Sequence, residues 1–558
     1  MLKFRLQCWC EANSILTRSQ AGFRIGRSCQ DNIGSIIIEA NNSLMRSECT
    51  VAAFLDVSSN VHFNTLIEIL ANLGLAGNIL NFISNLIYRR KAIIASDSPD
   101  ITTRDLYKGV PQGGVLSSLL FNLYTKNILP HLPPHTKLMQ FADTIAITVT
   151  HKSRSTAIST LEDSVESVRK NLLTLGLELF THKTQFLSFN TGNTPPRSLH
   201  LKVNGQRISN LQTARFLEVQ IDQHLKFDAH ILNLSTHCHQ TLNILRSLRG
   251  TWWGCGSQTL LTIFKSLIRS KIEYGTWWLY PTHNNGLASK SKQLQAQAAK
   301  LALGLRSCTP NNVALAEARL PPIEVRARYL GSKYILQIRI GSFHNNPIST
   351  LLLEFHRNYS DCHKGLLTKK VRGALLFQCL SQITPFHGYI EIQQHAPCYH
   401  SNPHLQLAKV NTNTSLGILL QTSPAPNCEF NSYFSNSTPN HILIYTDSPK
   451  MQHSLFTGAT YVCPQLSTGR DISLNPISSI FTAECAAISM TTDLANNNRE
   501  LSYTICSDSL NAIQAIDGKP FNMVMNPYIV KIKEGLQDFA VNSPSGSSIS
   551  LLWVLGPR

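Results

Sequence analysis

Two aspartates occupy positions from which their carboxylates could hold metal ions. Asp56 lies near the end of the apolar segment 51–57, which is predicted to form a buried strand. Asp143 lies at the tip of a predicted hairpin made of the segments 137–142 and 145–150. Carboxylates on neighbouring elements can hold two divalent ions, one activating an attacking hydroxyl and the other stabilising a leaving pyrophosphate. The pair therefore predicts a nucleotidyl-transfer site.

The segment between the two aspartates contains a glycine-rich turn and an apolar helix. Residues 109–124 read GVPQGGVLSSLLFNLY, and a helix is predicted over 115–129. Each feature also has an ordinary explanation, because a single aspartate at a strand end is usually a cap or a turn residue and an apolar helix alone is core. The ordered occurrence of all of them favours one shared site.

A second set of carboxylates lies near the end of the sequence. Asp447, Glu484 and Asp508 fall on alternating predicted strands and helices, so they could converge and bind two metal ions for hydrolysis. The alternative is that the two aspartates are turn residues and the glutamate is an exposed helix residue. The predicted elements are a strand over 441–445, a helix over 481–494, a strand over 501–506 and a helix over 509–516.

The charge balance points to a polyanionic partner. The chain has 558 residues, which predicts two to four domains, with 50 Lys and Arg against 33 Asp and Glu and a net charge of +17. Residues 1–440 hold 43 basic and 24 acidic residues, so a nucleic-acid backbone is expected to bind there. Generic basicity is the alternative. Apolar residues at 43% and charged residues at 15% exclude a disordered or fibrous chain.

The cysteines and the hydropathy pattern argue for an intracellular protein. The 14 cysteines show no CxxC pairing and no spacing typical of a zinc site, so buried or free thiols are expected. The first residues lack the apolar core of a signal peptide, and no apolar run is long enough to cross a bilayer. No membrane partner is therefore expected.

The order of these motifs resembles the LINE-type, or non-LTR, retrotransposon reverse transcriptases over most of residues 1–340. This resemblance implies an RNA-directed DNA polymerase with palm, partial fingers and thumb. The segments that carry it are QAGFRIGRS (20–28), FLD (54–56), GVPQG (109–113), LLFNLY (119–124), FAD (141–143), Lys183-Thr184, FLEV (216–219) and IRSKIEYG (268–275).

The resemblance also implies roles for individual residues. Asp56 and Asp143 would be catalytic metal ligands, and Mg²⁺, or alternatively Mn²⁺, would be the cofactor. Arg24 and Arg27 would lie near the incoming triphosphate, where a guanidinium suits phosphate oxygens. The implied partners are an RNA template, a DNA primer, an RNA–DNA hybrid and dNTPs, in the nucleus, the cytoplasm or both. Gln112 and Gly113 would shape the nucleotide and template pocket, and Lys183 would lie near the phosphates.

The C-terminal carboxylates resemble those of ribonuclease H, which cleaves the RNA strand of an RNA–DNA hybrid. The resemblance rests on YTD (445–447), TAE (482–484) and SDS (507–509), and it makes Asp447, Glu484 and Asp508 catalytic metal ligands. The expected fold class is α+β. The predicted domains are partial fingers and palm over 1–222, a helical thumb and connection over 223–380, a linker over 381–440, and a truncated α/β ribonuclease H-like domain over 441–558.

Several departures from the family pattern predict a degenerate, truncated copy with impaired catalysis. The family has F-A-D-D where this chain has Thr144 at the fourth position, and the first motif lacks three residues, A-F-D, after Ser59. Glu218 replaces a glycine, Ser448-Pro449 replaces Gly-Ser, and the similarity begins inside the fingers. The last residues, WVLGPR (553–558), end before the ribonuclease's catalytic loop. An inactive nucleic-acid-binding remnant of a mobile element is the alternative to an enzyme, and an element fossil with no selected role is a third reading.

Overall fold

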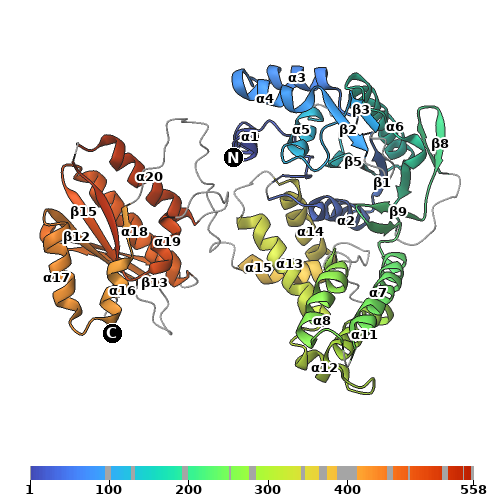
Figure 1. Ribbon diagram of the computed structural model, residues 1–558. Coiled ribbons are helices and arrows are strands. Elements are labelled where there is room, and N and C mark those ends of the chain that lie inside the picture. Colours follow the sequence, from blue (N-terminus) through green and yellow to red (C-terminus); the bar gives the residue numbers. More distant parts are fainter. Residues whose placement is uncertain are drawn as a thin grey trace. The chain divides into compact units, whose positions relative to one another are not determined.

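The protein divides into two compact units, residues 1–339 with 343–385 and residues 340–342 with 386–558. They are shown in Figure 1, a ribbon diagram of the computed structural model. Each unit is described by itself. The residues that the structure describes are 2–24, 26–58, 60–94, 102–126, 128, 132–190, 199–250, 253–275, 285–340, 346–363, 374–385, 411–448, 457–475, 478–517, 526–544 and 546–554.

A four-stranded sheet with the order β4-β5-β1-β6 forms the centre of the first unit. In β1 every residue except the last is buried, because the strand lies inside the sheet and both of its faces are covered. Val51, Ala53 and Leu55 share a core with α6, whereas Thr50 on the opposite face bonds to Ser43 of α2. The elements are β1 (Cys49–Asp56), β4 (Thr136–Phe141), β5 (Thr144–His151), β6 (Gln185–Ser188), α2 (Cys29–Met45) and α6 (Arg154–Thr174).

The predicted strand and hairpin of this region are confirmed. The helix expected over 115–129 is shorter and covers only Ser117–Tyr124 as α5. The other elements are α1 (Leu2–Ala12), α3 (Phe63–Asn72), α4 (Gly77–Ile87), the paired strands β2 (Arg90–Ile94) and β3 (Thr102–Leu106), the 3₁₀ turn Thr181–Lys183, the paired strands β7 (His200–Val203) and β8 (Gln206–Ser209), and the paired strands β9 (Thr213–Phe216) and β10 (Val219–Asp222).

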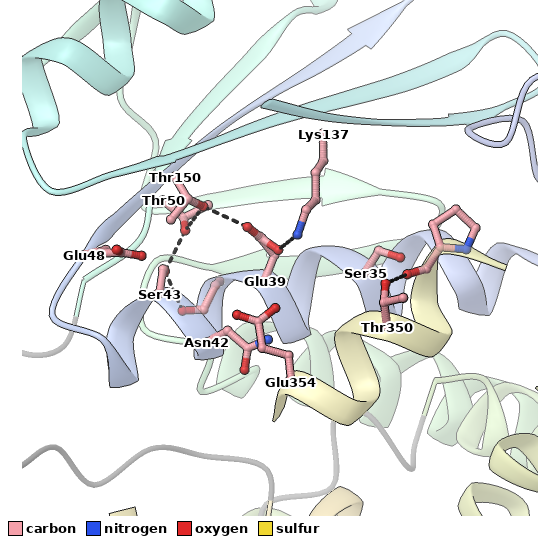
Figure 2. Close-up of polar contacts among 12 residues, drawn as sticks. Ser35, Glu39, Asn42, Ser43, Glu48, Thr50, Lys137, Thr150, Thr350 and Glu354 are labelled. Carbon is pink, nitrogen blue, oxygen red and sulfur yellow. Dashed lines mark hydrogen bonds and ion pairs between the residues drawn. The ribbon is translucent and has the colours of Figure 1, made fainter. Parts of the chain in front are cut away.

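Helix α2 was not among the predicted elements, and it is buried along almost its whole length. A helix with Asn, Ser and Glu on its faces is buried only where those groups have partners. Glu39 accepts a hydrogen bond from Thr150 at 3.0 Å and pairs with Lys137, and Thr50 bonds to Thr150 at 2.9 Å, as Figure 2 shows. This polar network fixes α2 against β1, β4 and β5.

The other side of α2 is covered by α14 (Pro347–His363), which lies far away in the sequence. Asn358 donates to Asn42 at 3.2 Å, and Arg46 pairs with Glu354; Asn42 and Glu354 lie close together in Figure 2. The core of the first 221 residues is therefore completed by a helix from beyond them.

The expected long helical region after residue 228 is confirmed as a series of helices. No helix in the described parts of the chain is long and apolar enough to cross a membrane. The series consists of α7 (Asp228–Leu248), α8 (Ser257–Phe264), a π-helical turn (Lys265–Arg269), α9 (Ser270–Glu273), α11 (Asn285–Leu303), α12 (Asn311–Glu317), α13 (Ile323–Ile340), α14 and α15 (Ala374–Ile383).

A six-stranded sheet with the order β11-β16-β15-β12-β13-β14 forms the second unit. Strands β11, β16, β15 and β12 pair in parallel, and β12, β13 and β14 pair in antiparallel fashion. The four elements predicted here are confirmed within a few residues. The elements are β12 (His441–Asp447), β13 (Thr457–Cys463), β14 (Thr468–Leu474), α18 (Ile480–Asn497), β15 (Ser502–Ser507), α19 (Leu510–Asp517), α20 (Pro527–Asn542) and β16 (Ile549–Trp553).

Part of the segment that we assigned to a linker, 381–440, belongs to this sheet. Residues 411–437 form β11 (Asn411–Asn413), α16 (Ser415–Thr422) and α17 (Pro426–Ser437). Strand β11 pairs with β16, and Leu416 and Leu420 of α16 are buried against Leu552. The composition, dense in Pro, Asn and Ser, concealed these elements because short edge elements gain their stability from packing and not from local periodicity.

Candidate active site

The two aspartates predicted to act together lie on adjacent strands of the first unit. Asp56 is the last residue of β1 and pairs in register with Thr144, the first residue of β5. Asp143 occupies the turn between β4 and β5, and its carbonyl oxygen accepts a hydrogen bond from the Val57 N–H at 3.2 Å. The sheet register therefore brings the strand end and the hairpin tip together.

The negative charge of Asp56 contributes to a shift in the pKa of Asp143. Burial raises the pKa of the Asp143 carboxyl, and the negative charge of Asp56 raises it further, while Lys183 acts in the opposite direction. The Lys183 ammonium forms an ion pair with Asp56 at 2.9 Å and lies 4.6 Å from the centre of the Phe180 ring. A cation is thus already held at the site.

Thr144 occupies the position where a third carboxylate was expected from the family pattern. Direct cross-strand partners project from the same face of a sheet, so the Thr144 side chain shares a face with that of Asp56. A hydroxyl there adds no negative charge. The described donor set is two carboxylates, whose oxygens suit Mg²⁺, without the third.

Gln20 and Gly22 contact the β4–β5 turn that carries Asp143, although the sequence analysis gave them no individual role. The Gln20 Oε1 accepts hydrogen bonds from the Gly22 N–H at 2.8 Å and from the Ala142 N–H at 3.2 Å. A Cβ on Gly22 would lie 2.6 Å from the Ala142 nitrogen, and Asn122 donates to the Gly22 carbonyl oxygen at 2.7 Å. Ala142 has a φ of +56°, a conformation that needs such support. The motif QAG is therefore a clamp on the turn carrying Asp143.

Arg24 lies in a buried ion pair. Its guanidinium donates to both carboxylate oxygens of Glu11, at 2.9 and 2.5 Å, and to the Thr17 carbonyl oxygen at 2.7 Å. The Arg24 side chain is 9% exposed. These contacts commit its donors to the fold, and the phosphate role implied by the family pattern stays a prediction.

Arg27 is also directed into the protein. Its Nη1 donates to the Asn346 Oδ1 at 2.8 Å, and burial, followed by the positive charge of Arg24, lowers its pKa to about 10. Asp31 nearby accepts hydrogen bonds from Tyr334 and, at 3.4 Å, from Asn346. This buried cluster joins the start of α2 to α13 and to the residue before α14.

Gln112 and Gly113 lie on an exposed turn before α5. The Gly114 N–H donates to the Pro111 carbonyl oxygen at 3.0 Å, and Gly113 has a φ of +83°, which a type II turn requires at its third residue. The start of this segment is tied to the residues between β1 and α3, because the Gly109 N–H donates to the Val61 carbonyl oxygen at 2.8 Å. The roles of Gln112 and Gly113 in a nucleotide pocket stay predictions.

The missing A-F-D triplet maps beside Ser59, which lies outside the described residues. On one side of this position, Ser58 is held by two hydrogen bonds of 2.9 Å with Glu178, one through its N–H and one through its Oγ.

The Glu218 substitution falls in a turn that favours glycine. Leu217 and Glu218 join β9 to β10 with φ values of +45° and +67°, and two-residue hairpin turns with positive φ at both positions prefer Asn-Gly. We expect Glu218→Gly to raise the free energy of unfolding by about 1 kcal/mol, because glycine adopts this conformation without a Cβ clash. Urea denaturation of the full chain measures this gain in stability. The control is Glu317→Gly in helix α12, which is expected to destabilise the chain.

The three C-terminal carboxylates lie on neighbouring elements of the second unit. Asp447 ends β12, Asp508 follows β15, which is the parallel neighbour of β12, and Glu484 lies in the second turn of α18. Burial, then Asp508, then Asp447 raise the pKa of Glu484 to about 7, with the Ser448 hydroxyl opposing weakly. Burial and Asp447 also raise the pKa of Asp508. These mutual effects place the three groups within electrostatic reach of one another.

Glu484 is the buried member of this trio. It is 5% exposed, and its Oε2 has no hydrogen-bond partner within the described residues. A buried carboxylate oxygen without a donor is costly unless a cation binds it or it takes up a proton. Still, no group of three or more His, Cys, Asp or Glu side chains in the described ranges is already arranged to hold a metal ion.

Trp553 supports Asp508 from the neighbouring strand. Its indole N–H donates to the Asp508 carbonyl oxygen at 3.0 Å, and a Cβ on Gly417 of α16 would lie 2.2 Å from the Trp553 ring. The Ser448 N–H donates to the Asp447 carboxylate at 2.7 Å. Pro449, whose change from the family pattern was noted above, and residues 555–558 lie outside the described residues.

Comparison with known proteins gives one family and several relatives. Residues 1–221 match the family described as reverse transcriptase (RNA-dependent DNA polymerase). A 115 kDa protein in the type-1 retrotransposable element R1DM of Drosophila melanogaster is 24% identical over 331 residues, which are 57% of this chain and 31% of that protein. The RNA-directed DNA polymerase from the mobile element jockey of the same species is 21% identical over 365 residues, 62% of this chain and 38% of the relative. A polymerase from transposon BS is 24% identical over 293 residues, 51% and 32% of the two chains.

The sheet with paired aspartates and the family match together define residues 1–221 as a reverse transcriptase domain. Through its relatives the chain is similar to the LINE-type, non-LTR reverse transcriptases. It spans between 31% and 38% of the length of these relatives.

Proposed function

We propose that the first unit is the polymerase part of a non-LTR retrotransposon reverse transcriptase, acting on an RNA template, a DNA primer and dNTPs. The observation that carries this proposal is the pairing of β1 with the β4–β5 hairpin, which sets Asp56 beside Asp143 inside a matched reverse transcriptase domain. Asp56 and Asp143 would hold divalent ions, Mg²⁺ or Mn²⁺, which supply hydroxyl activation and charge stabilisation when bound.

The residues of the chain itself would prepare this site. The Gln20 and Gly22 clamp fixes the turn carrying Asp143, and Lys183 forms an ion pair with Asp56. We propose that catalysis is impaired in this chain, because Thr144 contributes no charge and the first motif is three residues short. A loss of several kcal/mol of transition-state stabilisation would lower the rate by orders of magnitude, at about tenfold for each 1.36 kcal/mol.

We further propose that residues 411–554 form a ribonuclease H-like unit. One supporting observation is a mixed sheet in which an antiparallel three-stranded meander continues into parallel strands. The other is that acidic residues lie at the ends of two neighbouring parallel strands, β12 and β15, and on the helix α18 that connects them. Asp447, Glu484 and Asp508 would be the ligands, and the unpartnered Glu484 oxygen fits a cation. Because these groups are not yet in ligating geometry, an ion would have to draw them together.

Binding and extension separate the polymerase from an inactive remnant. We expect the unmodified chain to bind a primer–template with an affinity that falls steeply with salt, as several phosphate contacts require, and to extend the primer only in traces. Fluorescence anisotropy at several salt concentrations and primer extension with Mg²⁺ or Mn²⁺ measure the two properties. Robust extension would contradict the impairment, and absence of salt-dependent binding would contradict a nucleic-acid function.

The pKa of Glu484 predicts a pH dependence of stability in the second unit. Its folded pKa of about 7 lies above the ordinary value of 4.5, so the folded state holds a proton that the unfolded state has lost. The stabilisation is full below about pH 4.5 and is lost as the pH rises through 7, by up to about 3 kcal/mol. Thermal unfolding between pH 4.5 and 8 should show this decline in the unmodified chain and a smaller one in Glu484→Gln. The matched control is the exposed Glu534→Gln, and equal slopes for all three chains would contradict the prediction.

A further inference from the structure

The turn between β9 and β10 needs a support outside its own hairpin. Leu217 and Glu218 both have positive φ, and neither is a glycine. Residues with a Cβ hold such a conformation only where surrounding contacts fix it. The ion pair between Glu218 and Arg215 lies within the hairpin, with both side chains more than 60% exposed, so it contributes little.

The external contact comes from Tyr274, which follows α9 in the helical region. Its hydroxyl donates to the Leu217 carbonyl oxygen at 2.9 Å. Burial, together with the neighbouring Cys29 and Glu218, raises the pKa of Tyr274, so the hydroxyl keeps its proton and remains a donor. Tyr274 thus reaches the strained turn at its backbone.

Tyr274 is itself held by the residue before it. Glu273 accepts hydrogen bonds from Arg269 in the same helical segment and from Arg326 of α13, the latter at 2.8 and 3.1 Å. An Arg–carboxylate contact through two nitrogens is geometrically specific. The sequence Glu273-Tyr274 therefore links α13 to the β9–β10 turn.

The position of this turn is also tied to the candidate polymerase site. The Phe216 ring lies 5.3 Å from that of Phe54, two residues before Asp56 on β1. The Arg215 N–H donates to the Gln185 side chain at 2.8 Å, two residues after Lys183. A displacement of the turn would therefore affect β1, which carries Asp56, and β6, which begins two residues after Lys183.

We propose that Tyr274 is a positioning residue, which holds the β9–β10 turn in place beside β1 and β6 through its hydrogen bond to Leu217. Any effect of this positioning on primer–template binding rests on the proposed function. The positioning itself does not, since it concerns contacts within the first unit.

Hydrogen exchange of the full chain tests this proposal. Tyr274→Phe removes only the hydroxyl, and we expect exchange in residues 213–222 to become about fivefold faster, the loss expected for one hydrogen bond. Glu218→Gly relieves the turn, so the double variant Tyr274→Phe/Glu218→Gly should return to about the original rate. The matched control is Tyr329→Phe, an exposed tyrosine of α13.

The outcomes separate positioning from general stability. Faster exchange confined to the β9–β10 segment, with rescue by Glu218→Gly, supports the proposal. Unchanged exchange there, or equal acceleration throughout α8 to α13, overturns it. Primer–template affinity is measured on the same variants. If the unmodified chain binds no primer–template, the proposed function fails while the exchange result still decides the role of Tyr274.

Discussion

Restoring the polymerase motifs should raise primer extension by roughly 100-fold or more over the unmodified chain, corresponding to about 3 kcal/mol of recovered transition-state stabilisation. The variant combines Thr144→Asp with insertion of Ala-Phe-Asp after Ser59. Because residue 144 is the register partner of Asp56, the new carboxylate would face Asp56 on the same side of the sheet. Primer extension on an RNA template with Mg²⁺ measures the gain.

Two controls make this result specific. Adding Asp143→Asn to the restored chain should abolish the gain, because it removes a proposed ligand beside Asp56. Thr144→Asn matches the size of the new side chain without its charge and should give no gain. The like charges at 56 and 144 should also lower thermal stability without Mg²⁺ and make it rise when Mg²⁺ is added. A restored chain that folds and binds primer–template but gains no activity would contradict the assigned cause of impairment.

Replacing Arg24 should destabilise the first unit by about 3 kcal/mol. Arg24→Ala leaves the Glu11 carboxylate, 13% exposed, without its bidentate partner, and an unpaired buried charge is costly. Urea denaturation of the full chain, with hydrogen exchange in residues 2–24 as a local readout, measures the loss.

The control for this prediction is a similar pair at the surface. Arg169 also contacts a glutamate, Glu166, through two nitrogens, but it lies on an exposed face of α6, so Arg169→Ala should cost less than about 1 kcal/mol. Arg24→Ala/Glu11→Ala should recover part of the stability. If Arg24→Ala unfolds at the same urea concentration as the unmodified chain, the buried pair does not have the assigned structural role.

Local sequence patterns were sufficient to predict the elements that carry the carboxylates. The apolar runs around Asp56 and Asp143, and the turn residues between them, predicted β1 and the β4–β5 hairpin. The same holds for the elements around Asp447, Glu484 and Asp508. These signals are local, because side-chain period and turn chemistry are set by near neighbours in the chain.

Several features that the sequence did not reveal depend on contacts that form only when the chain folds. Arg24 fits a phosphate site by residue type, but its partner Glu11 is brought to it by folding of the first 24 residues. The burial of α2 depends on α14, more than 300 positions away in the sequence, and no local periodicity of α2 indicates that helix. The segment 411–437 acquires β11 only by pairing with β16.

The sequence by itself thus determined the resemblance to non-LTR reverse transcriptases, the order of the strands and helices with acidic residues, and which positions of the family pattern are changed. The tertiary structure alone decided that Thr144 faces Asp56, that Lys183 pairs with that aspartate, and that the QAG segment clamps the hairpin. A motif is recognised from the order of residues in the chain, whereas hydrogen bonds and ion pairs depend on distances that are set only when the chain is packed.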